Sequence, residues 1–547
     1  MPRKKIPREV AVIDFETDPF KYDRVPAPFA CGVLWRDEYR EFWGFDCGAQ
    51  AFEYLQTIDA KLVIYAHNGG KFDFYFLWPY LDNPMKIING RIVACKFGKH
   101  ELRDSYAILP FPLREFEKTA IDYAKFEPEV REKHRVEILA YLHDDCTGLK
   151  KLVDAFVERF GFALTIAGVA MKQLQKLHPQ EFQGQSHDAR MRKFYFGGRV
   201  SCFDSGVLVG NWKVYDVNSM YPSVMRDFDH PMGKHYRVLL SNITLDADNW
   251  IAGYPGEMYF CEVSGINFGA LPIRDDENAF EGLNFNVEVG TFTTTSHELR
   301  AAIELGKFEV VEIHSAMLPR KTQRFAEFVD TYAAEKALAK KTKDKTSEIF
   351  AKLILNSAYG KFGQNPDKFK EWRFEQRNER GGCSNISELM QSGWQLEQGA
   401  KEWTVWSKPA VAFQYFDVAI AASVTSAARS VLLRAVAKST RPIYCDTDSI
   451  ICEKLAGVEI HASRLGAWKL EAIGDRVAIA GKKLYALFRD AWTDKAAVKW
   501  ASKGTRLAPS EIVKIARGGE VTWESDAPNF SLSGKVKFTK RKSRRTV

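Results

Sequence analysis

The sequence predicts a multidomain protein that combines α/β and α+β architecture, and three observations support this prediction. The chain has 547 residues, of which 46% are apolar, enough for several domains with cores of their own. Segments with the period of strands alternate with segments that have the period of helices. Acidic residues form two separate sets, one in the first third of the chain and one after residue 210. We therefore expect two distinct chemical centres.

The first acidic set begins on a predicted strand. Residues 12–17 alternate apolar and acidic side chains, which places Asp14 and Glu16 on one face. Asp73 follows a second predicted strand, residues 62–66. Further along the chain, Tyr141 and Asp145 stand four residues apart, on one face of a predicted helix. The candidates to hold two metal ions are Asp14, Glu16, Asp73 and Asp145, with Tyr141 orienting a water molecule.

The second acidic set combines three carboxylates. Residues 213–222 are predicted to form a strand that ends in a turn at Asp216, with Pro222 opening a helix. Asp446 and Asp448 point the same way if they lie in a strand, and strand formers on both sides favour a hairpin. Like charges this close repel, and a divalent cation relieves the repulsion. Two metal ions shared by these acids would suit phosphoryl transfer, whereas a solvated turn is the alternative for the last pair.

A predicted helix, residues 346–362, offers contacts for a phosphate group. Its apolar stripe contains Phe350, Leu353, Ile354 and Ala358, and Lys352 and Tyr359 recur seven residues apart on another face. A lysine on that face suits a triphosphate, and an aromatic ring suits a base or a sugar. The alternative is a surface lysine and a packed tyrosine.

Six segments together resemble one family. The segments DVNSMYPSVM, KLILNSAYGKFGQNP and YCDTDSI, in this order, resemble motifs A, B and C of the family B DNA polymerases. FYFGGR, TSAAR and KLY resemble the YxGG, TxxAR and KxY motifs of the protein-primed branch of that family, and the resemblance extends to the tectivirus-type bacteriophages. It implies a DEDDy (RNase H-like) 3′-5′ exonuclease domain and a right-hand polymerase with palm, fingers and thumb, interrupted by two terminal-protein-region insertions.

The resemblance implies a division into seven parts. These are residues 1–190, the exonuclease domain; 191–227, the YxGG linker and motif A; 228–325, the first insertion; 326–365, the fingers with motif B; 366–409, the second insertion; 410–475, the palm with motif C; and 476–547, the thumb and a basic tail. The two ends of the second insertion, residues 371–375 and 402–406, alternate polar and aromatic residues, which predicts a projecting hairpin.

The resemblance also assigns roles to individual residues. Lys125 is either a catalytic-site lysine or an ordinary surface lysine, and Tyr106 stands where the family has leucine. The expected contacts of the exonuclease with single-stranded DNA are Thr17, Asn68, Phe72, Ser105 and Tyr106. The expected contacts with the incoming nucleotide are Ser219, Met220, Tyr221, Lys340, Lys341, Lys352, Asn356 and Tyr359. The expected contacts of the polymerase with DNA are Tyr195, Gly197, Gly198, Arg199, Thr425, Arg429, Lys483 and Tyr485.

The implied activity is DNA-directed DNA synthesis with two Mg²⁺ ions per active site, Mn²⁺ being an alternative, together with 3′-5′ proofreading. The implied partners are template–primer DNA, deoxynucleoside triphosphates and a separate terminal protein whose hydroxyl starts the chain, and strand displacement is expected. The enzyme would replicate a linear viral genome as a monomer in the cytoplasm of an infected bacterium. The alternatives are a polymerase that needs no primer and a DNA-binding factor with decayed active sites.

Composition fits these expectations. Lysine and arginine exceed aspartate and glutamate by 78 − 70 = 8, a modest excess that suits a polyanionic partner. Basic residues concentrate at both ends of the chain, where they serve either DNA contact or solubility. Nine scattered cysteines without a CxxC pair suggest reduced thiols and no zinc ribbon. We expect no membrane span and no secretory signal, and we interpret the apolar stretch 411–437 as a buried helix.

Overall fold

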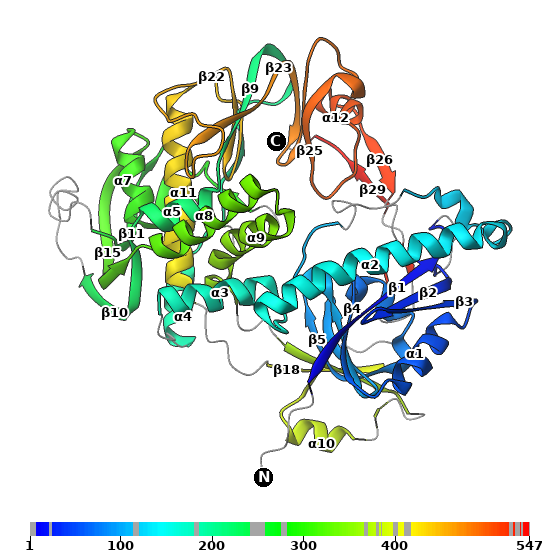
Figure 1. The fold of residues 1–547 in the computed structure, drawn as a ribbon. Coiled ribbons are helices and arrows are strands. Elements are labelled where there is room, and N and C mark those ends of the chain that lie inside the picture. Colours follow the sequence, from blue (N-terminus) through cyan, green and yellow to red (C-terminus); the bar gives the residue numbers. More distant parts are fainter. Residues whose placement is uncertain are drawn as a thin grey trace. The chain divides into compact units, whose positions relative to one another are not determined.

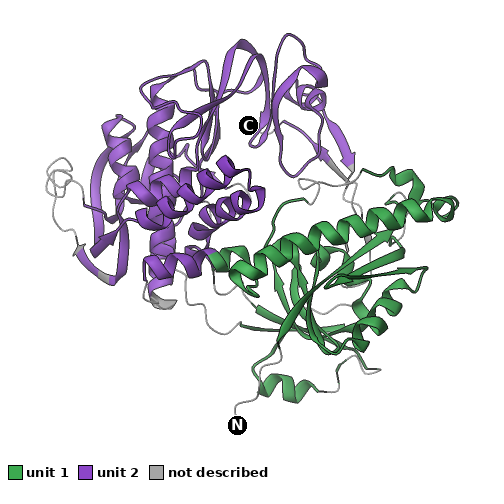
Figure 2. Cartoon of the chain, viewed as in Figure 1, with its two compact units in different colours: residues 1–169, 365–413, 525–539 green, residues 170–364, 414–524, 540–547 purple. Residues whose placement is uncertain are grey.

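The computed structural model describes residues 7–20, 25–112, 120–179, 185–240, 257–274, 282–365, 370–378, 382–383, 385–397, 403–409, 417–524, 529–530, 536–537 and 540–545. The chain forms two compact units, coloured separately in Figure 2. The first unit comprises residues 1–169, 365–413 and 525–539, and the second comprises residues 170–364, 414–524 and 540–547. Each unit is therefore assembled from segments that are far apart in the sequence.

The first unit is built on a ten-stranded mixed sheet (Figure 1). Its centre is parallel, because β1 pairs with β4 and β4 with β7 in the same direction, and the flanking pairs are antiparallel. In sheet order the strands are β17 (Gln395–Leu396), β18 (Trp403–Pro409), β16 (Lys370–Gln376), β5 (Leu81–Ile88), β6 (Arg91–Phe97), β7 (His100–Asp104), β4 (Lys61–Ala66), β1 (Arg8–Thr17), β2 (Pro28–Trp35) and β3 (Glu38–Trp43).

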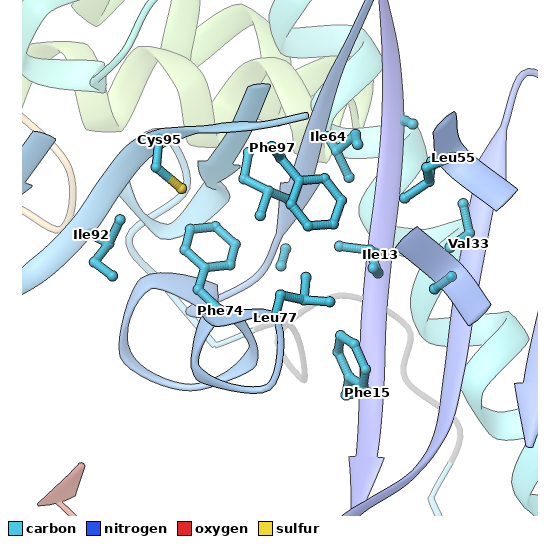
Figure 3. Close-up of a cluster of buried hydrophobic side chains, with 14 of the residues drawn as sticks. Ile13, Phe15, Val33, Leu55, Ile64, Phe74, Leu77, Ile92, Cys95 and Phe97 are labelled. Carbon is cyan, nitrogen blue, oxygen red and sulfur yellow. The ribbon is translucent and has the colours of Figure 1, made fainter. Parts of the chain in front are cut away.

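The two faces of β1 have different roles. Ile13 and Phe15 point into an apolar core that also contains Leu55 of helix α1 (Cys47–Thr57) (Figure 3). Strand alternation then sends Asp14 and Glu16 to the opposite face. That face receives helix α2 (Arg135–Phe160), which packs along β1 and β2. The predicted strand therefore places its two acids against the helix that carries Tyr141 and Asp145.

The hairpin predicted in the second insertion is confirmed, because β16 and β18 pair antiparallel from Lys370↔Pro409 to Gln376↔Trp403. The prediction that this hairpin projects from the protein is wrong. β16 also pairs with β5, so the hairpin extends the sheet of the first unit. Phe374 is 3% exposed and belongs to the same apolar core as β1. Residues 379–381, near the predicted bridge of the hairpin, lie outside the described part of the chain.

The second unit contains a seven-stranded antiparallel sheet that carries the second acidic set. The expected boundary between residues 475 and 476 falls inside β23, which continues through it as one strand. In sheet order the strands are β25 (Ala497–Ser502), β24 (Leu484–Phe488), β23 (Trp468–Gly481), β9 (Gly206–Val217), β21 (Ser449–Cys452), β20 (Tyr444–Asp446) and β8 (Val200–Cys202).

A second, four-stranded sheet occupies the region of the first insertion. Helix α7 (Ser296–Glu304) lies between two of its strands along the chain. Residues 241–256 and 275–281 of this region lie outside the described part of the chain. The strands, in sheet order, are β10 (His230–Leu240), β15 (Phe308–Gln323), β11 (Phe260–Asn267) and β14 (Val289–Thr295).

Three long helices pack in the second unit. Helix α9 (Lys345–Phe362) confirms the predicted helix, and Asp344 caps its first turn by accepting a hydrogen bond from the Ser347 amide at 3.0 Å. Helix α8 (Ala326–Thr342) packs against it. Among the described residues, helix α11 (Val418–Lys438) has the length and apolar composition of a membrane span, but 89% of its most apolar window is buried inside the protein. It is therefore a core helix, which confirms the prediction for residues 418–437, whereas residues 411–416 of the predicted stretch lie outside the described part of the chain.

Shorter elements complete the described chain. The helices are α3 (Ile166–Leu177), α4 (Gln185–Met191), α5 (Met220–Asp227), α10 (Ile386–Gln391) and α12 (Pro509–Ala516), and the strands are β12 (Ile273–Arg274), β13 (Leu283–Asn284), β19 (Ser439–Thr440), β22 (Lys454–Leu455), β26 (Val521–Glu524), β27 (Asn529–Phe530), β28 (Val536–Lys537) and β29 (Lys540–Ser543).

Candidate active sites

The first unit brings three of its four predicted acids together. Asp14 and Glu16 come from β1, and Asp145 comes from α2. One carboxylate oxygen from each lies within 4.8 Å of the others, which is close enough to share a metal ion. Oxygen ligands of this kind suit Mg²⁺ and Mn²⁺. The cluster forms because Asp14 and Glu16 are two residues apart on one face of β1, and Asp145 of α2 lies opposite them.

Asp73, the fourth acid, lies beside the cluster. It stands in a short turn after β4 and is 2% exposed. Burial raises the pKa of its carboxyl group, and the negative charge of Asp14 raises it further. The shift indicates that the carboxyl groups of Asp73 and Asp14 are close together in a desolvated pocket. A bound cation would relieve this repulsion.

Tyr141 lies one helical turn before Asp145. Burial raises the pKa of its hydroxyl group, followed by the hydrogen bond with Tyr123 and the charges of Asp145 and Glu16. The hydroxyl oxygens of Tyr123 and Tyr141 are 3.4 Å apart. A neutral phenol beside the acids can orient a water molecule, as expected for a DEDDy centre. Sequence analysis did not select Tyr123, because no motif contains it.

The residues expected to contact single-stranded DNA differ in how far their side chains are exposed to solvent. The Asn68 side chain accepts a hydrogen bond from Arg91 at 2.7 Å, and Arg91 also pairs with the buried Asp104 at 2.6 Å. Ser105 is fully buried and lies 2.9 Å from the His67 ring. Thr17 is 8% exposed, and Phe72 and Tyr106 are partly exposed.

Two of these residues are therefore held within the protein. Asn68 is fixed by Arg91, and Ser105 is enclosed by the protein, so the structure gives both a supporting position in the wall of the site. Phe72 packs edge-on against Phe20, with ring centroids 5.6 Å apart. Lys125 forms an ion pair with Glu137, an exposed residue of α2.

The second unit places Asp216 beside Asp448. Asp216 is the penultimate residue of β9 and pairs with Ser449, the first residue of β21. The Val217 amide donates a hydrogen bond to the Asp448 carbonyl oxygen at 2.8 Å. Burial, followed by the charge of Asp448, raises the pKa of Asp216 from 3.8 to about 6. The two carboxylates therefore face one desolvated position at the end of adjacent strands.

The strand alternation predicted for Asp446 and Asp448 is wrong, whereas the hairpin is confirmed. Asp446 ends β20 and pairs with Ser449 across the hairpin. Thr447 has a φ of +54°, and the Asp448 amide donates a hydrogen bond to the Asp446 carbonyl oxygen at 2.5 Å. The acidic pair is thus the turn itself, which places Asp448 next to β9 and gives Asp446 different neighbours.

Asp446 is neutralised by a lysine. The Lys483 ammonium group donates to both carboxylate oxygens of Asp446 at 2.7 Å. Tyr485, 6% exposed, lies near the same carboxylate, and burial followed by the charge of Asp446 raises its pKa to about 12. The KxY segment predicted to hold the primer end therefore also holds motif C. In this arrangement Asp216 and Asp448 remain the acidic pair with excess negative charge.

Two tyrosines from separate motifs stack on one another, and the charge of Asp448 acts on both. The rings of Tyr221 and Tyr359 have centroids 3.9 Å apart and are inclined by 19°. Tyr221 lies in the first turn of α5, which begins at Met220, so Pro222 stands within that turn and does not open the helix. Ser219 precedes it with a φ of +57°. The turn joins Asp216 to Tyr221 within a few residues.

Lysines line two neighbouring helices. Lys340 and Lys341 on α8 and Lys352 on α9 are exposed, as is Asn356. Lys336 of α8 was not predicted. Burial lowers its pKa, followed by the charges of Lys352 and Lys340. Lys336 therefore faces Lys352 across the α8–α9 pair, and the i,i+4 spacing from Lys340 was the signal in the sequence.

Lys499 is a second basic residue that sequence reasoning missed. It lies on β25, forms an ion pair with Glu471 of β23, and is electrostatically linked to Asp216 and Asp448. Burial lowers its pKa. No local pattern marks it, because strand pairing in the sheet brings it to the acids. The site thus contains cations on both sides of the carboxylates.

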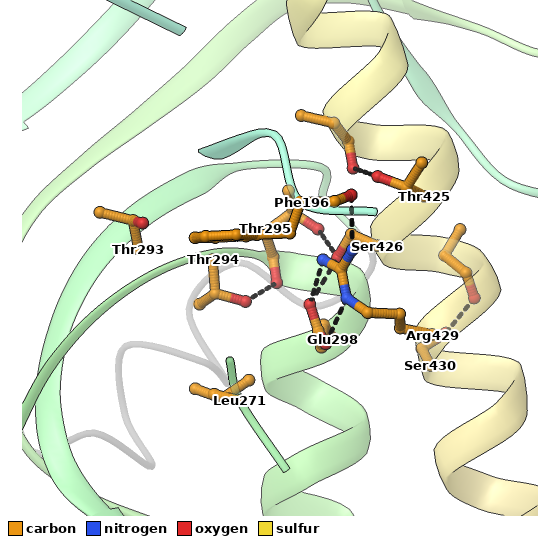
Figure 4. A network of polar contacts seen from close by, with 12 residues as sticks. Phe196, Leu271, Thr293, Thr294, Thr295, Glu298, Thr425, Ser426, Arg429 and Ser430 are labelled. Atoms are coloured by element: carbon orange, nitrogen blue, oxygen red, sulfur yellow. Dashed lines mark hydrogen bonds and ion pairs between the residues drawn. The ribbon is translucent and has the colours of Figure 1, made fainter. Parts of the chain in front are cut away.

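Thr425 and Arg429, the residues of the TxxAR segment expected to contact DNA, are engaged within the protein in this structure. Both residues are 2% exposed on the buried helix α11. The Thr425 hydroxyl donates to the Ala421 and Ala422 carbonyl oxygens of its own helix at 3.1 and 3.2 Å. Arg429 forms an ion pair with Glu298 (Figure 4). Their contact with DNA stays a prediction.

The YxGG segment crosses the second unit between these elements. A Cβ atom on Gly363, at the end of α9, would lie 2.5 Å from the Tyr195 hydroxyl oxygen, so Tyr195 packs closely there. Gly197 is exposed and has open space around its Cα. A Cβ atom on Gly198 would lie 2.6 Å from the Thr447 hydroxyl oxygen. Arg199 is 6% exposed and donates to the Gly269 carbonyl oxygen at 2.8 Å, and its contact with DNA stays a prediction.

Comparison with known proteins gives a consistent answer. Residues 115–455 match the family described as DNA polymerase type B, organellar and viral. The chain is 44% identical to the DNA-directed DNA polymerase of Enterobacteria phage PRD1, over 98% of this chain and 98% of the relative. It is 27% identical to the DNA polymerase of Bacillus phage phi29, over 88% of this chain and 87% of that one.

Solved structures share the fold. The phi29 DNA polymerase in an orthorhombic crystal form matches with a TM-score of 0.72 at 19% identity, covering 99% of this chain and 100% of that one. The same polymerase complexed with primer-template DNA and incoming nucleotide also matches with a TM-score of 0.72, at 20% identity and the same coverage. The sequence matches and the fold agree, and the chain belongs to the organellar and viral branch of the type B family of DNA-directed DNA polymerases.

Proposed function

We propose that this protein is a protein-primed replicative DNA polymerase with 3′-5′ proofreading, and that Asp216 and Asp448 are its synthetic centre. The observation that carries the proposal is their juxtaposition at the end of adjacent strands, where burial and mutual repulsion raise the pKa of Asp216 to about 6. A pair of desolvated carboxylates with excess negative charge fits divalent cations.

The donor set fits the metal ions that such chemistry requires. Asp216 and Asp448 would hold them, with Asp446 nearby in its bond to Lys483. Bound Mg²⁺ or Mn²⁺ would activate the attacking hydroxyl and neutralise charge on the leaving pyrophosphate. Lys352, Lys340 and Lys336 form a basic face that attracts the triphosphate, and Lys341 adds charge at the end of α8. The amides of Ser219 and Met220 are further candidates for phosphate contact.

Tyr221 and Tyr359 are proposed to shape the nucleotide pocket. Their stacked rings form a rigid surface within reach of the charge of Asp448, and each ring restricts movement of the other. A ring at that place fills the volume that a ribose 2′-hydroxyl would need. Lys483 and Tyr485 hold the Asp446 side of the site, where the primer end would lie, and Asn356 faces the nucleotide from α9.

We propose that the first unit is the proofreading exonuclease. Its acids Asp14, Glu16 and Asp145 meet within 4.8 Å, and Asp73 stands beside them. Tyr141 would orient the attacking water, while Thr17, Phe72 and Tyr106 would receive the frayed primer end. Asn68 and Ser105 support this site through Arg91 and His67.

The priming and strand-separating functions are proposed from the branch of the family that the motifs resemble. A separate terminal protein would supply the first hydroxyl, and the β16–β18 hairpin is the candidate element for strand displacement. The PRD1 and phi29 relatives are bacteriophage proteins, which supports action in the cytoplasm of an infected bacterial cell on a linear viral genome.

The two proposed activities are separable by mutation. Asp448→Ala removes one of the two acids at the synthetic centre, and we expect primer extension to fall at least about 10³-fold while digestion of single-stranded DNA persists. Asp14→Ala with Glu16→Ala should give the reverse. Each variant is the folded control for the other, and both activities are measured on one labelled primer. Ordinary extension by a folded Asp448→Ala protein would refute the assignment.

Discrimination between sugars tests the tyrosine stack. Tyr221→Val removes the ring and opens space beneath the incoming sugar, so we expect ribonucleotide incorporation relative to deoxynucleotide incorporation to rise by about 10- to 100-fold. Tyr221→Phe keeps the ring and is the matched control. Steady-state incorporation of a single ribonucleotide measures the ratio. An unchanged ratio in Tyr221→Val would leave Tyr221 with a packing role alone.

The pH dependence of stability tests the buried charge of Asp216. Its folded pKa, about 6, lies above its ordinary value of 3.8, so its ionisation destabilises the folded protein as pH rises through this interval. Asp216→Asn should therefore stabilise the metal-free protein at pH 8 by about 1–2 kcal/mol, with solvent screening of a partly exposed group allowed for. At pH 4, close to the ordinary pKa, most of this gain should be lost. Thermal unfolding in EDTA measures both, and equal gains at the two pH values would contradict the account.

Protein priming is tested by labelling. The polymerase is incubated with a radioactive deoxynucleotide, Mg²⁺ and the product of a candidate terminal-protein gene, and we expect label to become covalently attached to that second protein. Asp448→Ala is the control that should abolish the label. Chain initiation on a bare template with no second protein present would favour a polymerase that needs no primer.

A further inference from the structure

A buried ion pair in the second unit has no role in the proposed chemistry. Arg429 of α11 and Glu298 of α7 are each 2% exposed, and the guanidinium group donates to both carboxylate oxygens at 2.8 and 2.6 Å (Figure 4). Ser426 donates to the same carboxylate at 3.3 Å. Burying two charges is unfavourable unless their geometry is good, and removing one partner leaves the other charge unpaired. A tightly held arginine at this depth is therefore a fixed point of the fold.

Arg429 uses its remaining nitrogen to hold the YxGG segment. Its Nη1 atom donates to the carbonyl oxygens of two consecutive residues, Phe196 at 2.9 Å and Gly197 at 2.8 Å. Two adjacent carbonyl groups directed at one nitrogen fix both the position and the orientation of the backbone. Glu298 in turn orients the guanidinium plane, since the planar fork matches the carboxylate in a bidentate arrangement.

The next three residues of the chain contact the turn that carries the acids. The Thr447 amide donates to the Arg199 carbonyl oxygen at 2.7 Å, and Val200 pairs with Asp446 on the neighbouring strand. Gly198 packs against the Thr447 side chain so closely that a Cβ atom would lie 2.6 Å from its hydroxyl oxygen. Thr447, held in the left-handed region, separates Asp446 from Asp448.

We propose that Glu298 is a positioning residue for the synthetic centre, because through Arg429 and the YxGG segment it holds the Asp446–Thr447–Asp448 turn in place beside Asp216. This inference rests on the proposed function for its catalytic consequence, but the positional link itself is independent of it. Glu298 makes no contact with the acids of the turn in the described structure. Its effect is transmitted through backbone hydrogen bonds that begin at one guanidinium group.

The chain supplies a matched control. Glu304 of α7 pairs with Arg434 of α11 at 2.7 Å, on the same two helices and with the same chemistry. That pair is exposed. Arg434 donates to Glu304 through its Nε and Nη2 atoms. Arg429, in contrast, also donates to the carbonyl oxygens of the YxGG segment. An exposed ion pair contributes little to stability. Glu298→Gln and Glu304→Gln therefore remove the same charge from the same helix pair, and only the first affects the YxGG segment.

The experiment compares these variants by amide hydrogen exchange and by single-nucleotide incorporation. In Glu298→Gln we expect exchange in peptides covering residues 195–201 and 444–450 to accelerate by about 10-fold, the turnover number to fall about 10- to 100-fold, and the KM for nucleotide to stay within about 2-fold. Glu304→Gln should match the unmodified protein in all three. Exonuclease activity on single-stranded DNA should persist in both variants.

A second variant covers the case in which Glu298→Gln fails to fold. Gly198→Ala introduces a methyl group against Thr447 without touching the ion pair, and it should reproduce the faster exchange of residues 444–450 and the lower turnover number. Exchange of residues 444–450 that stays unchanged in a folded Glu298→Gln protein would overturn the inference, even if its melting temperature fell. If the unmodified protein incorporated no nucleotide, the proposed function would fail, and the exchange measurement alone would still decide the positional link.

Discussion

The second unit depends on holding two like charges side by side in a partly desolvated place. Asp216 ends β9, and Asp448 stands in the turn after β20, so the hydrogen bonds of the sheet bring the two carboxylates together at an energetic cost. The raised pKa of Asp216 is the sign of that cost. The remaining features of the site balance it: Lys483 neutralises Asp446, and Lys499 approaches from β25. In the proposed function, a divalent cation would complete the balance.

The first unit also holds carboxylates close together, but with different local geometry. Strand alternation puts Asp14 and Glu16 on one face of β1, and a single helix, α2, brings Asp145 to them. The other face of β1 anchors the core, which fixes the strand and therefore the acids (Figure 3). Each unit thus places part of its acidic set on a strand with buried neighbours, Asp14 and Glu16 on β1 and Asp216 on β9, and rigid support of this kind is what a metal centre requires.

The sequence predicted what is local and failed where tertiary pairing decides. Period-2 alternation was correct for Asp14 and Glu16, because β1 is a regular strand. It was wrong for Asp446 and Asp448, because the hairpin is so tight that the acids are the turn. The β16–β18 pairing was predicted, but its addition to β5 depends on residues nearly 300 positions away. The buried Arg429 and the missed Lys499 have the same explanation, since burial and neighbours across a sheet leave no mark in a short motif.

Buried and exposed basic residues have different roles in the second unit. Lys352 and Lys340 remain at the surface, where they can meet a triphosphate, whereas Arg429 is committed to Glu298 and to the backbone near the turn. The central claim is that Asp216 and Asp448 share a cation. Anomalous diffraction from crystals soaked in Mn²⁺ tests it most directly. The account predicts a Mn²⁺ peak within coordination distance of an oxygen from each residue. A crystal that shows Mn²⁺ bound at the acids of the first unit but no peak between Asp216 and Asp448 would contradict it.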